Sequence, residues 1–191
     1  MKSQLIISLK ILGIMTMLLG VIYPLFITGI AQLAFPSKAN GSLVEANGIL
    51  RGSELIGQKT DTAIYFNPRP SATDYNTLAS GGSNLSLTSK KLYELVQIRK
   101  TGIITKNKLS NATIVPADLL FASASGLDPH ISPEAAKIQI QRISEARGFS
   151  EGQKQKLSML VDKLIESPQF GIFGCKRVNV FMLNLELDKL K

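Results

Sequence analysis

The chain has 191 residues, a net charge of +8 and a single cysteine, Cys175. One cysteine excludes an internal disulfide and any metal site built from several thiolates. One long uncharged stretch lies near the N-terminus, and the residues after it suffice for one domain of ordinary size. We therefore expect a membrane-anchored protein with one folded domain.

The first predicted element is a transmembrane helix over Ile11–Phe35, a stretch without any charged residue. At about 1.5 Å per residue, roughly 20 apolar residues in a helix cross a hydrocarbon core about 30 Å thick. The stretch is apolar on every face, which argues against a helix of a soluble core. A cleaved signal peptide has an apolar core of only about 7–15 residues, so we favour a retained anchor.

Residues 1–10 are expected to form a short cytoplasmic N-terminus, because Lys2 and Lys10 carry positive charge there with no acid among them. Residues 36–191 would then lie outside the cytoplasm. Within the helix, Pro24 and the glycines Gly20 and Gly29 suggest close packing against partner helices. The alternative is a lone anchor with a mild kink.

Strands and turns are predicted next. The dipeptides Asn40-Gly41 and Asn47-Gly48 are typical of turns, and short strands are expected at 42–44 and 49–53. A third strand is predicted over Ile64–Phe66. It would be followed by an extended loop at Asn67–Pro70, where two prolines restrict the backbone. A second loop is predicted at Ser80–Asn84, in which Gly81 and Gly82 are expected to adopt positive φ.

Helices dominate the second half of the chain. They are predicted from Thr88 or Ser89 to Lys100 with Gly102 after it, over Pro116–Ser123, from Ser132-Pro133 to Gly148, and from Ser150 to Ser167-Pro168. Ser150 and Gln153 have the spacing of a capping box. A final strand is predicted over Arg177–Leu187, which is rich in β-forming residues. The expected fold is a single N-terminal transmembrane helix followed by a mixed α+β extracytoplasmic domain.

The segment Ser125–Ser132 holds the only histidine, His130, with Asp128 two residues before it. Serine, histidine and aspartate together invite a hydrolase interpretation, but triad members normally come from distant parts of a chain. Turn and capping roles for Asp128 and Ser132 are therefore favoured, and a membrane-anchored hydrolase stays a weaker alternative. One histidine and scattered carboxylates do not make up the three ligands of a metal site.

Two further patterns in the sequence could indicate a binding function. Basic residues cluster between Lys90 and Lys108, which could indicate anionic lipid or nucleic acid, but Tyr93 is the only aromatic residue among them. A solvated helix face and no nucleic-acid binding are the better interpretation. The glycine-rich loop at Ser80–Ser83 could cradle a phosphate, but the chain lacks the G-x-x-x-x-G-K-[ST] string. The sequence alone does not indicate a nucleophile, a base and an orienting group that could act together in catalysis.

A series of short motifs follows one order along the chain: Tyr23-Pro24-Leu25, Asn40–Leu43, Gly52–Gln58, Arg69-Pro70-Ser71-Ala72 with Tyr75, Ser80–Asn84, Pro116–Leu119, Ser125–Ser132, and Arg177–Val180 with Leu183-Asn184-Leu185. This series resembles the KdpC family, the small subunit of the bacterial Kdp potassium-transporting ATPase. The resemblance covers nearly the whole chain, and the strings GLDPHIS and RPSA are its most specific parts. The sequence departs from the family at Ala124, where glycine is usual, and at Cys175-Lys176.

The resemblance implies an accessory subunit of the cytoplasmic membrane without catalysis of its own. Its partners would be a channel-like subunit that selects K⁺ and a P-type ATPase subunit that hydrolyses ATP. This sequence has neither a D-K-T-G phosphorylation string nor a pore loop. We expect no cofactor of its own, and ATP bound only by the catalytic subunit.

Two roles are compatible with the resemblance. One is a scaffold outside the membrane that holds the other subunits together. The other is a chaperone that raises the ATP affinity of the catalytic subunit, since S-G-G-S resembles a signature loop of ABC transporters. A domain outside the cytoplasm could affect ATP binding only through coupling across the membrane, so the scaffold is favoured.

Residues in the motif strings are therefore expected to serve structure or partner contact rather than chemistry. In the membrane helix these are Gly20, Tyr23, Pro24 and Gly29. In the domain they are Arg69, Pro70, Ser71, Tyr75, Gly81, Gly82, Ser83, Asn84, Asp128, Pro129, His130, Ser132, Arg177 and Asn179.

Overall fold

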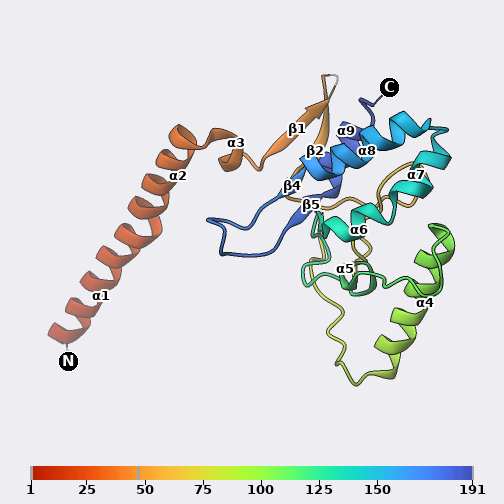
Figure 1. Cartoon of the computed structure of the whole chain (residues 1–191). Coiled ribbons are helices and arrows are strands. Elements are labelled where there is room, and N and C mark those ends of the chain that lie inside the picture. The colour runs from red at the N-terminus through yellow and green to blue at the C-terminus, as the bar shows by residue number, and fades with distance from the viewer. Residues whose placement is uncertain (1, 47, 191) are drawn as a thin grey trace. The chain divides into compact units, whose positions relative to one another are not determined.

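A computed structural model describes residues 2–46 and 48–190 of the chain (Figure 1). The chain divides into two compact units, Met1–Ser53 and Glu54–Lys191, and each is described by itself. The first unit contains the long helix and a β-hairpin. The second contains the remaining helices and a small sheet.

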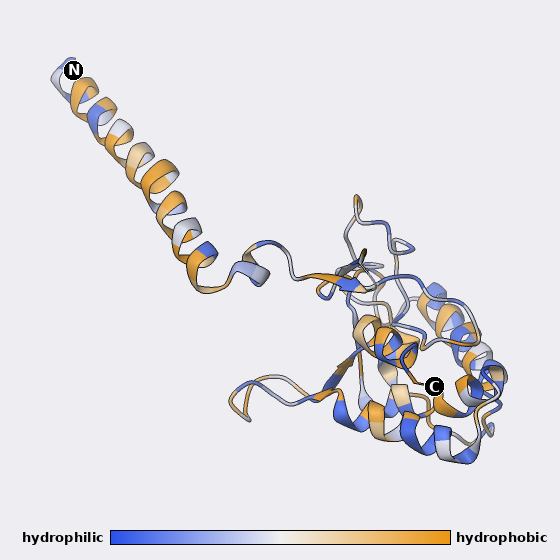
Figure 2. Cartoon of the chain, turned by 90° about the horizontal axis from the view of Figure 1, so that it is seen from above, coloured by the Kyte–Doolittle hydropathy of each residue, from blue (hydrophilic) through white to orange (hydrophobic). Residues whose placement is uncertain are grey.

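The N-terminal helix runs without a break through α1 (Lys2–Met17), the π-helical turn η1 (Leu18–Ile22) and α2 (Tyr23–Ala34). It begins at Lys2 rather than at Ile11, because an occasional lysine or serine ends the apolar run without interrupting a helix. Figure 2 shows hydrophobic residues along nearly its whole length. By length and composition it is a candidate membrane span.

The π-helical turn lies directly before Pro24. A proline has no backbone N–H, and its ring clashes with the carbonyl four residues earlier, here that of Gly20. Widening the turn at Leu18–Ile22 gives this carbonyl room, and the N–H of Tyr23 bonds to the carbonyl of Leu18. A Cβ at Gly29 would meet no atom of this chain within 4 Å, so nothing within the chain requires a glycine there. Packing of the helix against partner helices stays a prediction.

The rest of the first unit is a helical turn, α3 (Pro36–Ala39), and a hairpin of β1 (Leu43–Ala46) and β2 (Ile49–Ser53). The strands are antiparallel, with a register shift between Val44 and Glu45. Both strands predicted here are confirmed to within a few residues. Asn47 of the predicted turn lies outside the described residues, and Gly48 has a φ of 73°.

In the second unit, short helices surround an antiparallel sheet of three strands in the order β3-β5-β4. The elements are α4 (Lys90–Lys106), α5 (Ala117–Leu120), β3 (His130–Ile131), α6 (Pro133–Lys137), α7 (Ile140–Ala146), α8 (Glu151–Lys163), β4 (Ile165–Glu166), β5 (Arg177–Asn179) and α9 (Val180–Leu187). The central strand β5 pairs with both others, His130 opposite Asn179 and Ile165 opposite Val178. The predicted mixed α+β class is confirmed.

The core lies between the sheet and helices α6 to α9. Its fully buried side chains include Ile143, Leu157, Val161, Leu183 and Leu187, all on helices. The capping box of Ser150 and Gln153 is confirmed, with both reciprocal hydrogen bonds present at the start of α8. Ser132 and Ser89 cap α6 and α4 as predicted.

The predicted strand over Arg177–Leu187 is wrong beyond Asn179. The Asn179 side chain accepts a hydrogen bond of 3.1 Å from the backbone N–H of Met182 and thereby caps α9. Val180, Leu183 and Leu187 then fall at helical spacing on one buried face. Tertiary packing here overrides the β propensity of the segment.

The strand predicted at Ile64–Phe66 is also wrong. Phe66 is buried, but its backbone pairs with a side chain instead of a strand: its N–H donates to Asn184 Oδ1 at 2.8 Å, and its carbonyl accepts from Asn184 Nδ2 at 3.0 Å. These two bonds satisfy backbone groups that a neighbouring strand would otherwise pair.

Four predicted helix boundaries in the second unit need correction. The helix predicted from Ser150 to Ser167-Pro168 ends at Lys163, because Ile165 pairs with Val178 of β5 and forms strand β4 instead. Gly102 lies inside α4, which continues to Lys106, and the helix predicted over Pro116–Ser123 shortens to Ala117–Leu120. The helix predicted after Ser132 divides into α6 and α7, and the break at 138–139 lies where the buried Gln139 side chain bonds both Asn67 and the Ala135 carbonyl.

Candidate functional site

Four of the motif strings, far apart in the sequence, come together in the second unit. The Gly81 N–H donates to the Ser125 carbonyl at 2.9 Å, and the Ser123 N–H donates to the Pro70 carbonyl at 3.2 Å. The Val180 N–H donates to the Pro129 carbonyl at 2.8 Å, which joins this group to the sheet. We call the residues 69–75, 80–84, 125–132 and 177–179 the motif cluster.

An ion pair lies at the centre of the motif cluster. Arg69 Nη1 is 2.8 Å from Asp128 Oδ2, and both side chains are about three-quarters buried. The other carboxylate oxygen, Oδ1, accepts from the His130 N–H at 2.9 Å and lies 3.2 Å from His130 Nδ1. Burial alone would raise the pKa of Asp128, but the hydrogen bonds from His130 and Arg69 outweigh it and lower the pKa to about 2.

Ser71 and Tyr75 fix the loop that carries Arg69. The Ser71 hydroxyl accepts hydrogen bonds from the N–H groups of Thr73 and Tyr75 at 3.2 and 2.9 Å. The Tyr75 hydroxyl donates to the carbonyl of Arg69, and burial raises the pKa of this phenol. Asp74 and Tyr75 both have positive φ, a conformation that these contacts hold in place.

The sheet carries the remaining residues of the motif cluster. Arg177 Nε donates to Glu166 Oε2 at 2.9 Å, and His130 Nε2 lies 3.7 Å from Glu166 Oε1. Asn179 Nδ2 donates to the carbonyl of Glu54 at 2.7 Å. Arg177 of β5 and His130 of β3 thus both approach Glu166 of β4, while Asn179 ties the end of β5 to residue 54.

The hydrogen bonds of Ser132 and His130 do not match those of a hydrolase active site. The Ser132 hydroxyl donates to Asp118 Oδ1 at 3.1 Å and caps α6. Within the described part of the chain, no hydrogen bond joins a serine hydroxyl to His130, so a nucleophile and its base are not paired there. The same residues contain no group of three or more His, Cys, Asp or Glu side chains placed to hold a metal.

The glycines at 81 and 82 do not have positive φ, so that prediction is wrong. The left-handed conformation occurs instead at Asn84, with φ of 52°, and at Gly126, with φ of 72°. Gly82 matters through close packing, since a Cβ there would lie 3.2 Å from the Ala124 carbonyl oxygen, whereas Gly81 has open space. Ser83 and Asn84 are exposed at the edge of the motif cluster.

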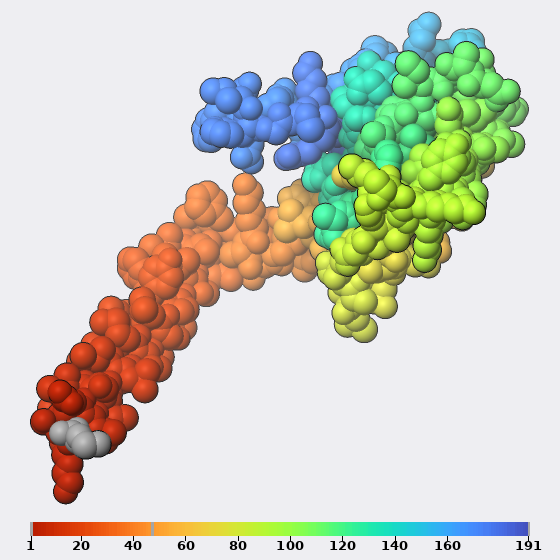
Figure 3. Space-filling model, turned by 90° about the horizontal axis from the view of Figure 1, so that it is seen from below, coloured from red at the N-terminus to blue at the C-terminus, as the bar shows by residue number. Residues whose placement is uncertain are grey.

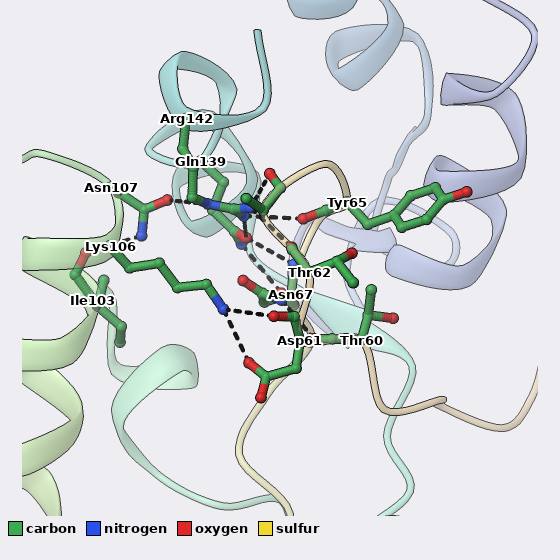
Figure 4. A network of polar contacts seen from close by, with 11 residues as sticks. Thr60, Asp61, Thr62, Tyr65, Asn67, Ile103, Lys106, Asn107, Gln139 and Arg142 are labelled. Carbon is green, nitrogen blue, oxygen red and sulfur yellow. Dashed lines mark hydrogen bonds and ion pairs between the residues drawn. The ribbon is translucent and has the colours of Figure 1, made fainter. Parts of the chain in front are cut away.

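A buried arginine that the sequence did not single out anchors the neighbouring loop (Figure 4). Arg142 Nε donates to Asn107 Oδ1 at 2.9 Å, and its Nη2 donates to Gln139 Oε1 and the Tyr65 carbonyl at 2.9 and 3.0 Å. Its Nη1 donates to the carbonyls of residues 62 and 63. Burial lowers the pKa of this guanidinium to about 10, so it stays charged at neutral pH. No local pattern in the sequence marks this arginine as buried, because adjacent helix positions such as 142 and 143 do not share a face.

A cavity of about 280 Å³ opens beside this network and the motif cluster. Arg69, Ser71 and Tyr75 line one side, and Arg99 and Lys106 of α4 line another. Lys106 pairs with Asp61 at 3.0 Å, so part of the basic charge of α4 is neutralised within the domain. Lys90 and Lys91 are exposed, as expected for a solvated helix face.

We predict that Asp128→Asn destabilises the domain at neutral pH by about 1–3 kcal/mol, because Arg69 would remain partly buried without its ion partner. The Asp128 pKa is depressed in the folded state, so its contribution is complete above about pH 4 and is lost as the pH falls toward 2. Denaturant unfolding at several pH values checks this. Equal loss of stability between pH 5 and 2 in variant and wild type would contradict it.

Fold and site together define a class of protein: a small α+β domain that follows an N-terminal candidate membrane span and in which several sequence motifs are bonded to one another. The family model described as KdpC, K+-transporting ATPase, c chain, matches residues 5–189. The chain therefore belongs to the KdpC family, the small subunit of the potassium-transporting ATPase.

Curated relatives agree over nearly the full length. Each of the following is described as a potassium-transporting ATPase KdpC subunit. The Leptospira interrogans protein is 46% identical over 182 residues, covering 95% of this chain and 92% of the relative. The Koribacter versatilis protein is 44% identical over 190 residues, covering 98% and 95%. The Mycobacterium bovis protein is 42% identical over 192 residues, covering both chains fully.

Proposed function

We propose that this chain is a non-catalytic accessory subunit that assembles and stabilises the channel-like and ATP-hydrolysing subunits of the Kdp complex. The observation that carries the proposal is the use of the motif residues. Arg69, Asp128 and His130 bond to one another, and Asn179 and Ser132 bond to the surrounding backbone and to Asp118. Because these side chains form hydrogen bonds within the domain, they stabilise its fold rather than remain free for chemistry. A stable, fixed surface is what a scaffold requires.

The alternative role, raising the ATP affinity of the catalytic subunit, has weaker support. A phosphate loop presents several free backbone N–H groups to its ligand. Here the Gly81 N–H and the Ser80 hydroxyl both donate to the Ser125 carbonyl, at 2.9 and 3.0 Å. These two donors of the glycine-rich loop are used inside the domain.

Ser83→Ala separates the two roles, since the Ser83 side chain is exposed and its loss leaves the backbone unchanged. We expect the ATP concentration for half-maximal K⁺-stimulated hydrolysis to stay within about twofold of wild type, with a normal yield of complex. The measurement is ATPase activity of complex purified through a tag on this chain. A several-fold rise in the ATP requirement with normal assembly would favour the chaperone role, and wild-type chain that brings down no other subunit would refute the scaffold role.

The proposal includes an orientation, with the N-terminus in the cytoplasm and the second unit outside it. The support is the positive charge of Lys2 and Lys10 before the apolar helix. We expect a membrane-impermeant thiol reagent to label Ile114→Cys in a Cys175→Ser background in intact cells without an outer-membrane barrier. Residue 114 is 90% exposed, so labelling that occurs only after lysis would reverse the orientation.

A further inference from the structure

The loop between β4 and β5 exposes three large apolar side chains. Phe170, Ile172 and Phe173 are 90%, 79% and 66% exposed. The loop projects from the body of the second unit, and its tip contains hydrophobic residues (Figures 2 and 3). Single exposed apolar residues are common on protein surfaces, but three within four positions are characteristic of an interaction site. We call residues 167–176 the apolar loop.

The backbone of the apolar loop is held in a defined shape. Gln169 and Phe173 exchange two backbone hydrogen bonds of 2.9 and 3.0 Å, and the Gly171 N–H donates to the Pro168 carbonyl at 3.0 Å. Phe170 has a φ of 54°, in the left-handed region that aromatic residues rarely adopt. The loop therefore presents its side chains in a fixed arrangement, which lowers the entropic cost of binding.

We propose that the apolar loop is an anchor that inserts these side chains into an uncharged, apolar pocket on another subunit of the potassium-transporting ATPase. This inference rests on the proposed function and names a contact through which assembly occurs. No charged residue occurs from Ser167 to Cys175. A charge in the receiving pocket would thus be buried without a partner, so the pocket is uncharged as well. Rigid aromatic side chains in such pockets carry much of the binding energy of interfaces.

Two other occupants fit less well. Segments that enter a lipid interface typically combine apolar residues with Trp or Tyr and with several Lys or Arg, whereas the apolar loop has no Trp or Tyr and its one cation is Lys176 at its end. A phenylalanine buries roughly 150–250 Å². The loop alone thus falls short of the roughly 800 Å² per partner that a standard interface buries, so it does not support a dimer of this chain by itself and serves as one contact within a larger interface with another subunit.

The test replaces Phe170→Asn together with Phe173→Ser in the full-length tagged chain. Both side chains are exposed, and asparagine accepts positive φ readily, so the melting temperature should not fall. We expect recovery of the other Kdp subunits to drop at least tenfold at equal expression. The matched control is Ile114→Ser, an exposed apolar residue outside the loop, and it should leave recovery unchanged.

A photo-crosslinking residue at Phe173 gives an independent readout. We expect a covalent product with another subunit of the complex, and none from the same residue placed at Ile114. Products with lipid or with a second copy of this chain would overturn the proposal, as would wild-type recovery by the double variant. If wild-type chain itself recovers no partner, the proposed function fails. If the wild-type chain recovers its partners and the loop variants recover them equally well, the loop inference fails while the proposed function stands.

Discussion

Replacing Arg142 with alanine should unfold much of the second unit, with an expected loss of about 3–5 kcal/mol in the free energy of unfolding. The guanidinium bonds three backbone carbonyls of the 62–65 loop and the side chains of Asn107 and Gln139 (Figure 4). Removing it leaves the buried Asn107 Oδ1 and the partly buried carbonyls of the 62–65 loop without this donor, while Gln139 Oε1 keeps the bond from the Asn67 N–H. Denaturant unfolding of the full-length chain in detergent, followed by limited proteolysis, measures the effect.

Arg142→Lys tests whether charge alone matters. A lysine keeps the positive charge but has three donors on one atom, so it cannot reach partners on both sides of the planar guanidinium. We expect it to recover less than half of the lost stability. Lys156→Ala, at an exposed position of α8, is the control and should change stability by less than about 0.5 kcal/mol. A loss below about 1 kcal/mol for Arg142→Ala would show that water replaces the arginine.

The second large effect is expected at Gly126, where alanine should cost about 2–4 kcal/mol. The glycine has a φ of 72°, and a Cβ would lie 2.6 Å from Thr73 Oγ1 and 3.0 Å from the Gly81 carbonyl oxygen. Backbone strain and steric overlap therefore add at the point where three strings of the motif cluster meet. Thermal unfolding and the yield of assembled complex should both fall.

Two variants separate these causes. Gly81→Ala has open space and no positive φ, so it should be nearly neutral in both measurements. Thr73→Ala removes the hydroxyl that the new Cβ would overlap, so in the double variant it should restore part of the lost stability while the strain from φ remains. A Gly126→Ala protein as stable as wild type would show that the loop relaxes without cost.

Local signals in the sequence predicted the parts of the fold that local chemistry decides. The uncharged run around Pro24, the capping serines at 89, 132 and 150, and the hairpin strands all depend on near neighbours. Gln139 and Asn184 belong to a different kind of structure, because each pairs its side-chain amide with the backbone of a residue more than 70 positions away. No periodicity reveals such a bond, so the strand predicted at Ile64–Phe66 was wrong.

The candidate site divides in the same way. Capping and turn roles for Ser132 and Asp128 followed from the spacing in their own segment. The ion pair of Asp128 with Arg69 joins positions 59 apart, and the sequence placed both residues in motif strings without placing them together. The membrane-helix residues Gly20, Tyr23, Pro24 and Gly29 stay predicted partner contacts, because packing partners for them would be other chains.

The position of β5 in the sheet has a consequence for how the chain is made. The middle strand of the sheet is the last to be synthesised, and Asn179 at its end bonds to Glu54, 125 positions earlier. At 5–20 residues per second, roughly 6–25 s pass between the synthesis of the two. During that interval β3 and β4 have no strand between them. The sheet of the second unit therefore cannot close before β5 has been made, and a chain that has not yet closed its sheet is the form that the proposed orientation requires for passage across a bilayer.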